Sequence, residues 1–434
     1  GGELPNGVFE SVLWVLTAAL LLTGFVGLAI TRLAPPALTH HGERLLFERI
    51  PVLRAQLAEE VHDLALRSVE TEASTTLADY YHTRLHSFFA RPRNLLAHLV
   101  APERPDLVLF ELAEGCDCAG VFTRNVFRAA PVQVAEAHLA GATSTRYLLV
   151  NTGNANAGMG QQGMRDALAC CQAVADTAGC SLDAVVPYST GVIGERLATE
   201  RIVDAIPHAM GSLRADGWLA AASAMATTDT RPKGASETVE LDGGSVTLTG
   251  IAKGAGMIRP NMATMLAFVA TDADLPTGLA RRALEDAVNA SFNRITIDGD
   301  TSTNDACTLL ATGQSGVAVG DRVSADYERF AAALTRLCTR LAHSIVRDGE
   351  GATRFVTIAV TGAASEAEAE AVGFTLGESP LVKTAIGAGD PNWGRLLAAV
   401  GRAGVRGLDV ETVRIWVGDY CIVQEGGRVP GYDE

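Results

Sequence analysis

The stretch from Ile251 to Leu275, IAKGAGMIRPNMATMLAFVATDADL, constrains the fold more than any other part of this 434-residue chain. The apolar residues 246–252 and 265–270, on either side of its glycines, have the composition of buried strands. Pro260 lies between them and cannot donate a hydrogen bond to a sheet, so we expect the chain to bend there. The sequence therefore predicts two strands joined by a glycine-rich bend, with Thr264 entering the second strand.

Thr264 has two interpretations on residue types alone. In the first, its hydroxyl attacks the carbonyl of Ala263, takes over the acyl group and is freed by hydrolysis, so that a new chain begins at Thr264. A threonine hydroxyl needs an adjacent base, and the new α-amino group, with a pKa of about 7.7–8, supplies one. The small side chain of Ala263 leaves the scissile carbonyl open. In the second interpretation, a glycine turn simply leads into a core strand, where a threonine is ordinary.

Composition and charge exclude several classes of protein. A hydrophobic content of 48% in a chain of this length is enough for two folded domains. The 35 basic residues against 50 acidic ones give a net charge of −15, so we expect no nucleic-acid partner. The eight cysteines lack paired C-x-x-C spacing, and no Cys/His pair lies beside Cys116-x-Cys118. We therefore expect no metal site and reduced thiols, as in a cytoplasmic protein.

The first hundred residues differ from the rest of the chain in their pattern of apolar and charged residues. Residues 12–30 form an apolar run that, at about 1.5 Å per residue, matches the thickness of a bilayer. Basic residues follow it, the first being Arg32, which places the rest of the chain in the cytoplasm. We predict a transmembrane helix that tethers the protein to the inner membrane, with a buried helix of a soluble core as the alternative. Residues 42–97 are typical of charged amphipathic helices, so residues 1–100 form the first predicted domain.

From about residue 105 onward, short strands alternate with helices. The expected strands are residues 106–112, 145–151, 182–187, 355–360 and 413–417. The expected helices are residues 168–178, 280–290 and 325–346, with a short helix from Ser365, which has capping-box spacing, to Gly373. The alternation predicts layered α/β architecture in a second domain, residues 101–434.

Two motifs suggest ligands that their surroundings exclude. Residues 158–163 match G-x-G-x-x-G, but seven residues, 151–157, separate them from the preceding strand, where a dinucleotide turn allows almost none. Residues 298–305, DGDTSTND, look like a calcium loop, but Thr303 and Leu309 stand where an EF-hand has Gly and Glu. We therefore expect neither a nucleotide nor a metal, and no other cofactor.

Three polar segments contain residues that can line a site. In STGVIG, the Thr190 hydroxyl and the Gly191 amide are suitable donors for a tetrahedral oxyanion, although a plain turn is the commoner role. In TTDTRPK, Thr227 begins what is ordinarily a polar loop. In DGEGAT, Glu350 lies in a glycine turn after a helix, which can equally be an exposed helix end.

These motifs together resemble those of the glutamate N-acetyltransferase/ornithine acetyltransferase family (arginine biosynthesis protein J). KGAGMIRPNMATML is similar to the self-cleavage and nucleophile motif of that family. NTGNANAGMGQQG, STG, TTDT, DGDTSTND, GEGAT and GDPNWGR match its other segments in the same order. The resemblance covers about residues 105–434. It implies a layered α/β sandwich, cut before Thr264 into an α part (101–263) and a β part (264–434) that stay associated, within a higher oligomer.

The resemblance also implies roles for individual residues. Thr264 would carry the acetyl group, while Thr190 and Gly191 would hold the oxyanion. Lys253 would supply the cation that the α-carboxylate of an acetylated amino acid needs, and Glu350 would pair with the ammonium group of ornithine. The residues that it places at the substrate are Thr227, Lys253, Thr264 and Glu350.

The implied reaction is a ping-pong transfer of acetyl from N-acetylornithine to glutamate, as a step of arginine biosynthesis. Whether acetyl-CoA also serves as donor is left open. One alternative is a self-cleaving amidohydrolase or aminopeptidase with water as acceptor. Another is a membrane-tethered fusion or fragment with an incomplete site. Family members continue past the stretch that matches PGYDE to a segment whose Asn and Thr contact substrate. Because the sequence stops at Glu434, we expect it to cut itself but to transfer acetyl poorly.

Overall fold

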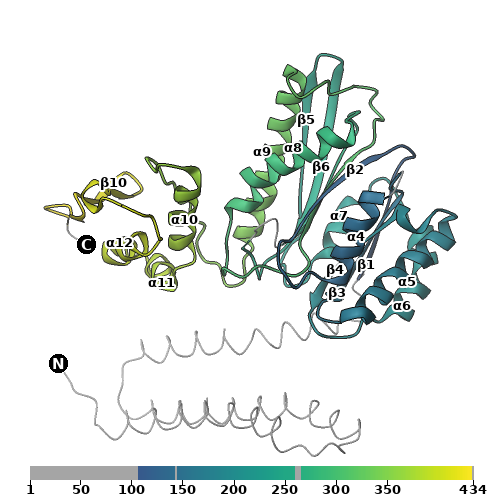
Figure 1. Cartoon of the computed structure of the whole chain (residues 1–434), viewed down its shortest axis with the longest axis horizontal. Helices are drawn as coiled ribbons and strands as arrows, with labels where there is room; N and C mark the ends of the chain where they lie inside the picture. The colour runs from purple at the N-terminus through teal and green to yellow at the C-terminus, as the bar shows by residue number, and fades with distance from the viewer. Residues whose placement is uncertain (1–105, 142–143, 260–264, 433–434) are drawn as a thin grey trace, which may run out of the picture. The chain divides into compact units, whose positions relative to one another are not determined.

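The computed structural model describes residues 106–141, 144–259 and 265–432 (Figure 1). The predicted transmembrane helix at 12–30 and the predicted helices at 42–97 lie outside these ranges, as do Ala263 and Thr264. Among the described residues, no helix is both long enough and apolar enough to cross a membrane.

The larger sheet has five strands in the order β2-β8-β7-β6-β5. Their bounds are Asp117–Phe122 for β2, Lys233–Leu241 for β5, Gly244–Lys253 for β6, Leu266–Thr271 for β7 and Ala306–Ala311 for β8. β6 is antiparallel to both β5 and β7, β7 is parallel to β8, and β8 is antiparallel to β2. The two strands predicted around the glycine bend are therefore confirmed, and they pair with each other, with Lys253 opposite Leu266.

The smaller sheet has three strands in the order β1-β3-β4. Their bounds are Leu107–Glu111, Tyr147–Asn154 and Val185–Val192, with β1 antiparallel and β4 parallel to β3. The strand predicted at 182–187 instead begins with a 3-10 turn, Leu182–Ala184, and continues further than expected. Thr190 and Gly191 consequently lie in the end of β4, rather than in a turn that follows a strand.

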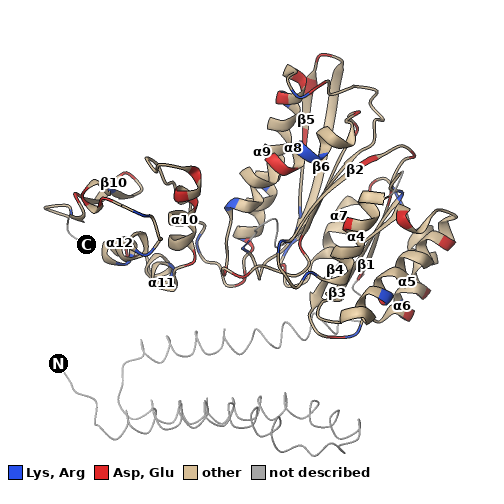
Figure 2. Cartoon of the chain, in the orientation of Figure 1, with Lys and Arg blue, Asp and Glu red and all other residues tan. Residues whose placement is uncertain are grey.

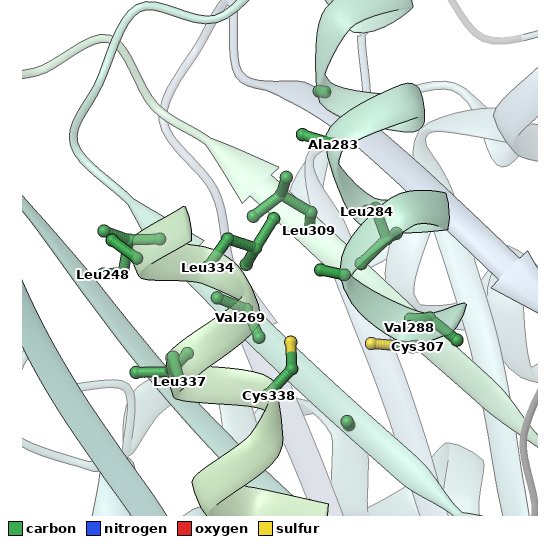
Figure 3. Close-up of a cluster of buried hydrophobic side chains, with 14 of the residues drawn as sticks. Leu248, Val269, Ala283, Leu284, Val288, Cys307, Leu309, Leu334, Leu337 and Cys338 are labelled. Atoms are coloured by element: carbon green, nitrogen blue, oxygen red, sulfur yellow. The ribbon is translucent and has the colours of Figure 1, made fainter. Parts of the chain in front are cut away.

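Helices pack against both sheets (Figure 1). Their bounds are Ala130–Gly141 for α4, Gly160–Ala178 for α5, Thr199–Gly211 for α6, Trp218–Met225 for α7, Thr277–Ala290 for α8 and Ala325–Arg347 for α9. On the larger sheet, Leu248, Val269 and Leu309 pack against Leu334 and Leu337 of α9 (Figure 3). The predicted helices at 280–290 and 325–346 are confirmed as α8 and α9.

The alternation of side chains along the strands creates the layers. Leu148 of β3 shares a core with Phe268 of β7, so the two sheets face each other there. The neighbouring Leu149 points the other way, into a core with Val174 of α5. The ring of Tyr188 on β4 contacts the ring of Phe268 edge-on, with ring centroids 4.9 Å apart. The α/β architecture that the sequence predicts is confirmed.

The C-terminal part of the described chain contains small elements. They are α10 (Glu366–Gly377), α11 (Pro380–Ala388), α12 (Trp393–Gly401), β9 (Ile415–Val417), β10 (Tyr420–Gln424) and β11 (Gly427–Arg428). The strand predicted at 355–360 is wrong, because no described strand pairs with these residues and a ladder needs a partner. The strand predicted at 413–417 is reduced to β9.

Helix α10 begins as the sequence predicts and ends later. The Ser365 hydroxyl accepts a hydrogen bond from the N–H of Glu368 at 3.2 Å, which confirms the cap. Acidic side chains in its first turn, visible in Figure 2, suit the positive end of the helix dipole. Gly373 does not end the helix, because it lacks the left-handed conformation of a C-terminal cap, and α10 runs on to Gly377.

Candidate active site

Lys253, the last residue of β6, lies at the centre of the candidate site. Its ammonium Nζ donates hydrogen bonds to Oγ1 of Thr190 at 3.1 Å and to Oγ1 of Thr227 at 2.8 Å. These two hydroxyls come from the end of β4 and from the loop after α7, so the facing sheets and a loop converge on one cation. Three of the residues predicted from the sequence are thus in direct contact.

Gly191 occupies a position that only glycine fits. Its φ is +135°, and a Cβ atom there would lie 2.2 Å from the carbonyl carbon of Gly153 on the neighbouring strand β3. The glycine therefore lets the ends of β3 and β4 approach each other closely. Gly191 directly follows Thr190, so its amide and that hydroxyl lie at the same end of the strand.

A buried charge cluster, Asp229, Lys233 and Asp348, lies behind Lys253. Nζ of Lys233 is 2.5 Å from Oδ1 of Asp229 and 2.6 Å from Oδ2 of Asp348. The three side chains are between 1% and 3% exposed. Asp229 also accepts a hydrogen bond from the N–H of Gly254 at 2.7 Å, which fixes the backbone directly after Lys253.

The charges of this cluster set the ionisation of its members. Burial lowers the pKa of Lys253. Asp229, with Oδ2 at 4.0 Å, opposes this shift, and the charge of Lys233 increases it. Burial alone would raise the pKa of Asp229, but the charges of Lys253 and Lys233 outweigh burial and keep it below its ordinary value. Burial and Lys233 thus oppose the charge of Lys253, whereas Asp229 supports it.

Glu350 lies on the other side of the glycine bend. Its N–H donates to the carbonyl oxygen of Ala255 at 2.7 Å, and its carboxylate lies against Gly256, where a Cβ atom would come within 2.6 Å of Oε1. Glu350 is exposed, and its charge acts on Lys253. Lys253 and the exposed carboxylate of Glu350 thus lie at the same bend. An amino acid with a charged side chain needs both kinds of group for its binding.

The DGDTSTND loop holds the site's backbone together. Nδ2 of Asn304 donates to the carbonyl oxygens of Ala155 at 2.6 Å and Ser189 at 2.9 Å, which joins the NTGNANA loop to β4 next to Thr190. The carboxylate of Asp298 accepts hydrogen bonds from the N–H groups of Met257 and Ile258 at 2.6 Å and 2.9 Å. These contacts give the loop a structural role.

The predicted cleavage site, Ala263 and Thr264, lies outside the described residues. The chain is described again from Met265, which is 3% exposed and whose carbonyl oxygen accepts a hydrogen bond from the N–H of Ala306 at 2.9 Å. In the next position, Leu266 pairs with Lys253 across the sheet. In the sequence, Thr264 is therefore two residues before Leu266, the strand partner of Lys253.

Sequence reasoning did not identify Asp229, Lys233 or Asp348 as site residues. Asp229 and Lys233 lie in the TTDTRPK segment, and Asp348 lies two residues before Glu350. Their closeness in sequence to Thr227 and Glu350 was a signal that could have identified them. Their contact could not be predicted, because Lys233 and Asp348 are 115 residues apart in the chain.

Comparison with known proteins shows the family of this chain. The model of the ArgJ family matches residues 95–434. The arginine biosynthesis bifunctional protein ArgJ of Methylococcus capsulatus is 56% identical over 331 residues, which are 76% of this chain and 81% of that protein. The protein of the same name from Pseudomonas syringae pv. tomato is 50% identical over 339 residues, which are 78% of this chain and 83% of that protein.

Two solved structures are also similar in sequence. A crystal structure of arginine biosynthesis bifunctional protein ArgJ from Bacillus halodurans is 30% identical and covers 36% of this chain and 99% of that one, with a TM-score of 0.31. A crystal structure of ornithine acetyltransferase complexed with ornithine, from Mycobacterium tuberculosis, is 29% identical and covers 38% of this chain and 89% of that one, with a TM-score of 0.31. The assignment rests on the sequence matches, and by them this chain belongs to the ArgJ family.

Proposed function

We propose that this protein transfers an acetyl group from N-acetylornithine to glutamate in arginine biosynthesis, through an acetyl ester on Thr264. The observation that carries the proposal is the convergence of Thr190, Thr227 and Lys253, in a family whose curated relatives are named as arginine biosynthesis enzymes. Acetyl transfer needs a nucleophile, donors for an oxyanion and a cation for the substrate's carboxylate. The last two functions have candidates in the described site, and Thr264 is the candidate for the first.

The proposed reaction proceeds in two half-reactions. The Thr264 hydroxyl attacks the acetyl carbonyl and gives its proton to the Thr264 α-amino group, while Thr190 and Gly191 donate hydrogen bonds to the oxyanion. The C–N bond of N-acetylornithine breaks, and ornithine leaves with the proton. The amine of glutamate then attacks the ester, and the Thr264 hydroxyl is restored as N-acetylglutamate forms.

Charge complementarity supports the binding roles of Lys253 and Glu350. Lys253 donates hydrogen bonds to the hydroxyls of Thr190 and Thr227, with Asp229 at 4.0 Å, and an α-carboxylate can add a charge-assisted pair. Glu350 is exposed at the same bend and suits the side-chain ammonium of ornithine.

Self-cleavage before Thr264 is the first test of this function. We expect denaturing electrophoresis of the purified protein to show two fragments, the second beginning Thr-Met-Leu-Ala-Phe by N-terminal sequencing. Thr264→Ala should remain a single inactive chain, because it lacks the attacking oxygen, whereas Thr264→Ser should still cut. A folded wild-type protein that stays uncut would exclude Thr264 as a nucleophile with a free amino group.

The acceptor is tested by product analysis. With N-acetylornithine as donor, we expect N-acetylglutamate to appear only when glutamate is present. Release of free acetate at a rate that glutamate does not change would indicate the amidohydrolase alternative. The same assay with acetyl-CoA in place of N-acetylornithine establishes whether the second donor is used.

We also propose that the two parts stay together after cleavage. The cut would fall between β6 and β7, which pair from Leu248–Thr271 to Lys253–Leu266 in the same sheet. Residues before and after the cut also share one hydrophobic core, with Leu248 on one side and Val269 and Leu337 on the other. Both fragments should elute together from a sizing column without denaturant, and the elution volume reports the predicted higher oligomer.

For the N-terminal segment, we propose a tether to the inner membrane through residues 12–30. The apolar run and the basic residues after it support this proposal. The full chain should sediment with cell membranes after a high-salt wash and dissolve only in detergent. Recovery in the supernatant of the washed membranes would favour the alternative, a buried helix of a soluble core.

A further inference from the structure

Asp229 is a buried carboxylate to which the proposed transfer assigns no role. It lies in the loop after α7, and its side chain is 1% exposed. Its Oδ1 accepts hydrogen bonds from Nζ of Lys233 at 2.5 Å and from the N–H of Gly254 at 2.7 Å. Its Oδ2 accepts one from the N–H of Thr227 at 3.1 Å and lies 4.0 Å from Nζ of Lys253. Both oxygens are therefore engaged by groups of the protein itself.

The contacts of Asp229 reach two residues that touch each other at the candidate site. The hydroxyl of Thr227 accepts a hydrogen bond from Nζ of Lys253 at 2.8 Å, while the N–H of Thr227 donates to Asp229. Gly254 directly follows Lys253 at the end of β6, so its bond to the same carboxylate fixes the backbone of the lysine. Asp229 thus joins the loop after α7 to β6 at the residues whose side chains are in contact.

Asp229 also differs from the other charged groups around Lys253. In the described part of the chain, the groups that act on this lysine are Asp229 after α7, Lys233 of β5, Asp305 before β8 and Glu350 after α9. Burial raises the pKa of Asp305 well above its ordinary value, which favours its neutral form, and Glu350 is exposed, so solvent screens its charge. Burial would also raise the pKa of Asp229, but the two lysines outweigh it and keep this carboxyl ionised.

We propose that Asp229 is a positioning residue for substrate binding: it holds Lys253 against Thr227 and supports the charge with which Lys253 binds an α-carboxylate. This inference rests on the proposed binding role of Lys253. The hydrogen bonds of Asp229 fix the place of the ammonium group, and its negative charge favours that form over the neutral amine. Asp229 acts through Lys253 and does not itself touch the substrate, because two carboxylates repel each other.

Asp229→Asn separates this role from a purely structural one. Asparagine keeps the size of the side chain and one carbonyl acceptor but carries no charge. Burial and Lys233 then act on Lys253 with less opposition, so its ammonium form should be lost at a lower pH than in the wild type. An opposite charge within about 4–6 Å shifts a pKa by about 1–3 units, so we expect a change of about one unit or more. Loss of packing alone would not produce a change in this direction.

The ionisation of Lys253 is measured directly by nuclear magnetic resonance. The chain has three lysines, Lys233, Lys253 and Lys383, so labelling lysine at its ε-carbon gives few signals, and Lys253→Met identifies one of them by its loss. We expect that signal to titrate at lower pH in Asp229→Asn than in the wild type. Asp216→Asn is the matched control, because Asp216 is an exposed carboxylate on the other side of α7, and Lys253 should titrate there as in the wild type.

Binding of N-acetylornithine to the same proteins is measured by calorimetry across the pH range. Each unit by which the pKa of Lys253 falls leaves about tenfold less of its ammonium form at alkaline pH, so Kd should rise there about tenfold or more. The rise should shrink as the pH is lowered through the new pKa, because protonation restores the charge of Lys253.

Two results would overturn the inference. One is an unchanged titration of Lys253 in folded Asp229→Asn, and the other is a Kd that rises equally at every pH. A wild type that binds N-acetylornithine but transfers no acetyl group would instead refute the proposed transfer, and both measurements would still decide on Asp229.

If Asp229→Asn does not fold, a double variant with Lys233→Met replaces it. Removing both members of a buried pair costs less stability than removing one. The double variant is compared with Lys233→Met alone, so that the two proteins differ only in the charge of Asp229. Lys253 should titrate at lower pH in the double variant, and equal titrations would contradict the proposed role.

Discussion

Lys253 is a buried ammonium group whose direct hydrogen-bond partners are neutral hydroxyls. Desolvation disfavours its charge, and Asp229 at 4.0 Å opposes this effect. At the residue scale, the chemistry of the site therefore depends on carboxylates that the substrate need not touch.

Glu350→Gln tests the recognition of ornithine. Glutamine keeps the shape of the side chain but removes its charge, so a charge-assisted hydrogen bond of about 1.5–3 kcal/mol should weaken. At tenfold per about 1.36 kcal/mol, we expect kcat/KM for N-acetylornithine to fall about ten- to a hundredfold in steady-state kinetics. Glu328→Gln, an exposed change in the first turn of α9, is the control. Unchanged kinetics in Glu350→Gln would assign Glu350 a purely structural role.

The sequence predicted much of the site at this scale. Lys253 contacts Thr190 and Thr227, and Glu350 lies at the same glycine bend. Thr227 and Lys253 were predicted through the family resemblance and not from their residue types. The charge cluster was not predicted. A buried ion pair depends on which loops meet in space, and no local pattern distinguishes it from two solvated charges.

At the scale of elements, Lys233 ties the start of β5 to the end of α9 through Asp348. Removing one partner of a buried pair leaves the other charge uncompensated and typically costs about 3–5 kcal/mol. We expect Lys233→Met to lower the free energy of unfolding by about that amount in urea titrations. Arg281→Met, which removes an exposed pair with Glu285 on α8, should cost about 0–1 kcal/mol. Equal losses in the two variants would show that the buried cluster has no special role.

The same cluster makes stability depend on pH. The pKa of Asp348 lies below its ordinary value because the contacts of Lys233 and Thr230 outweigh burial, and the pKa of Asp229 is also lowered. Their contribution is therefore fully present above the unfolded pKa of about 3.9 and is lost as the pH falls through the folded values. The difference in stability between the wild type and Lys233→Met should shrink as the pH is lowered below about 4. A constant difference down to acid unfolding would contradict this linkage.

Local patterns predicted the helices better than some of the strands. The apolar spacing in α9 and the cap at Ser365 are local signals, and both elements begin as expected. Residues 355–360 have strand composition, yet pairing is a non-local requirement and no described strand meets it. The strand predicted from residue 182 begins only at Val185, after a 3-10 turn at residues 182–184. The composition of a strand does not mark where pairing with β3 begins.

At the scale of the whole molecule, the central pairing of β6 with β7 explains how a cut chain can remain one protein. The two strands lie in the middle of the larger sheet, and both faces of that sheet are covered. A cut between β6 and β7 would remove no strand from the sheet.

The measurement that tests this account most directly is the mass of the fragment that begins at Thr264 after mixing with N-acetylornithine. Without glutamate, we expect that fragment to gain the mass of one acetyl group, located on the Thr264 oxygen by peptide sequencing. Adding glutamate should remove the group and yield N-acetylglutamate. Thr264→Ala should gain none. Turnover without an acetylated fragment, or an acetyl group on another residue, would contradict a transfer through Thr264.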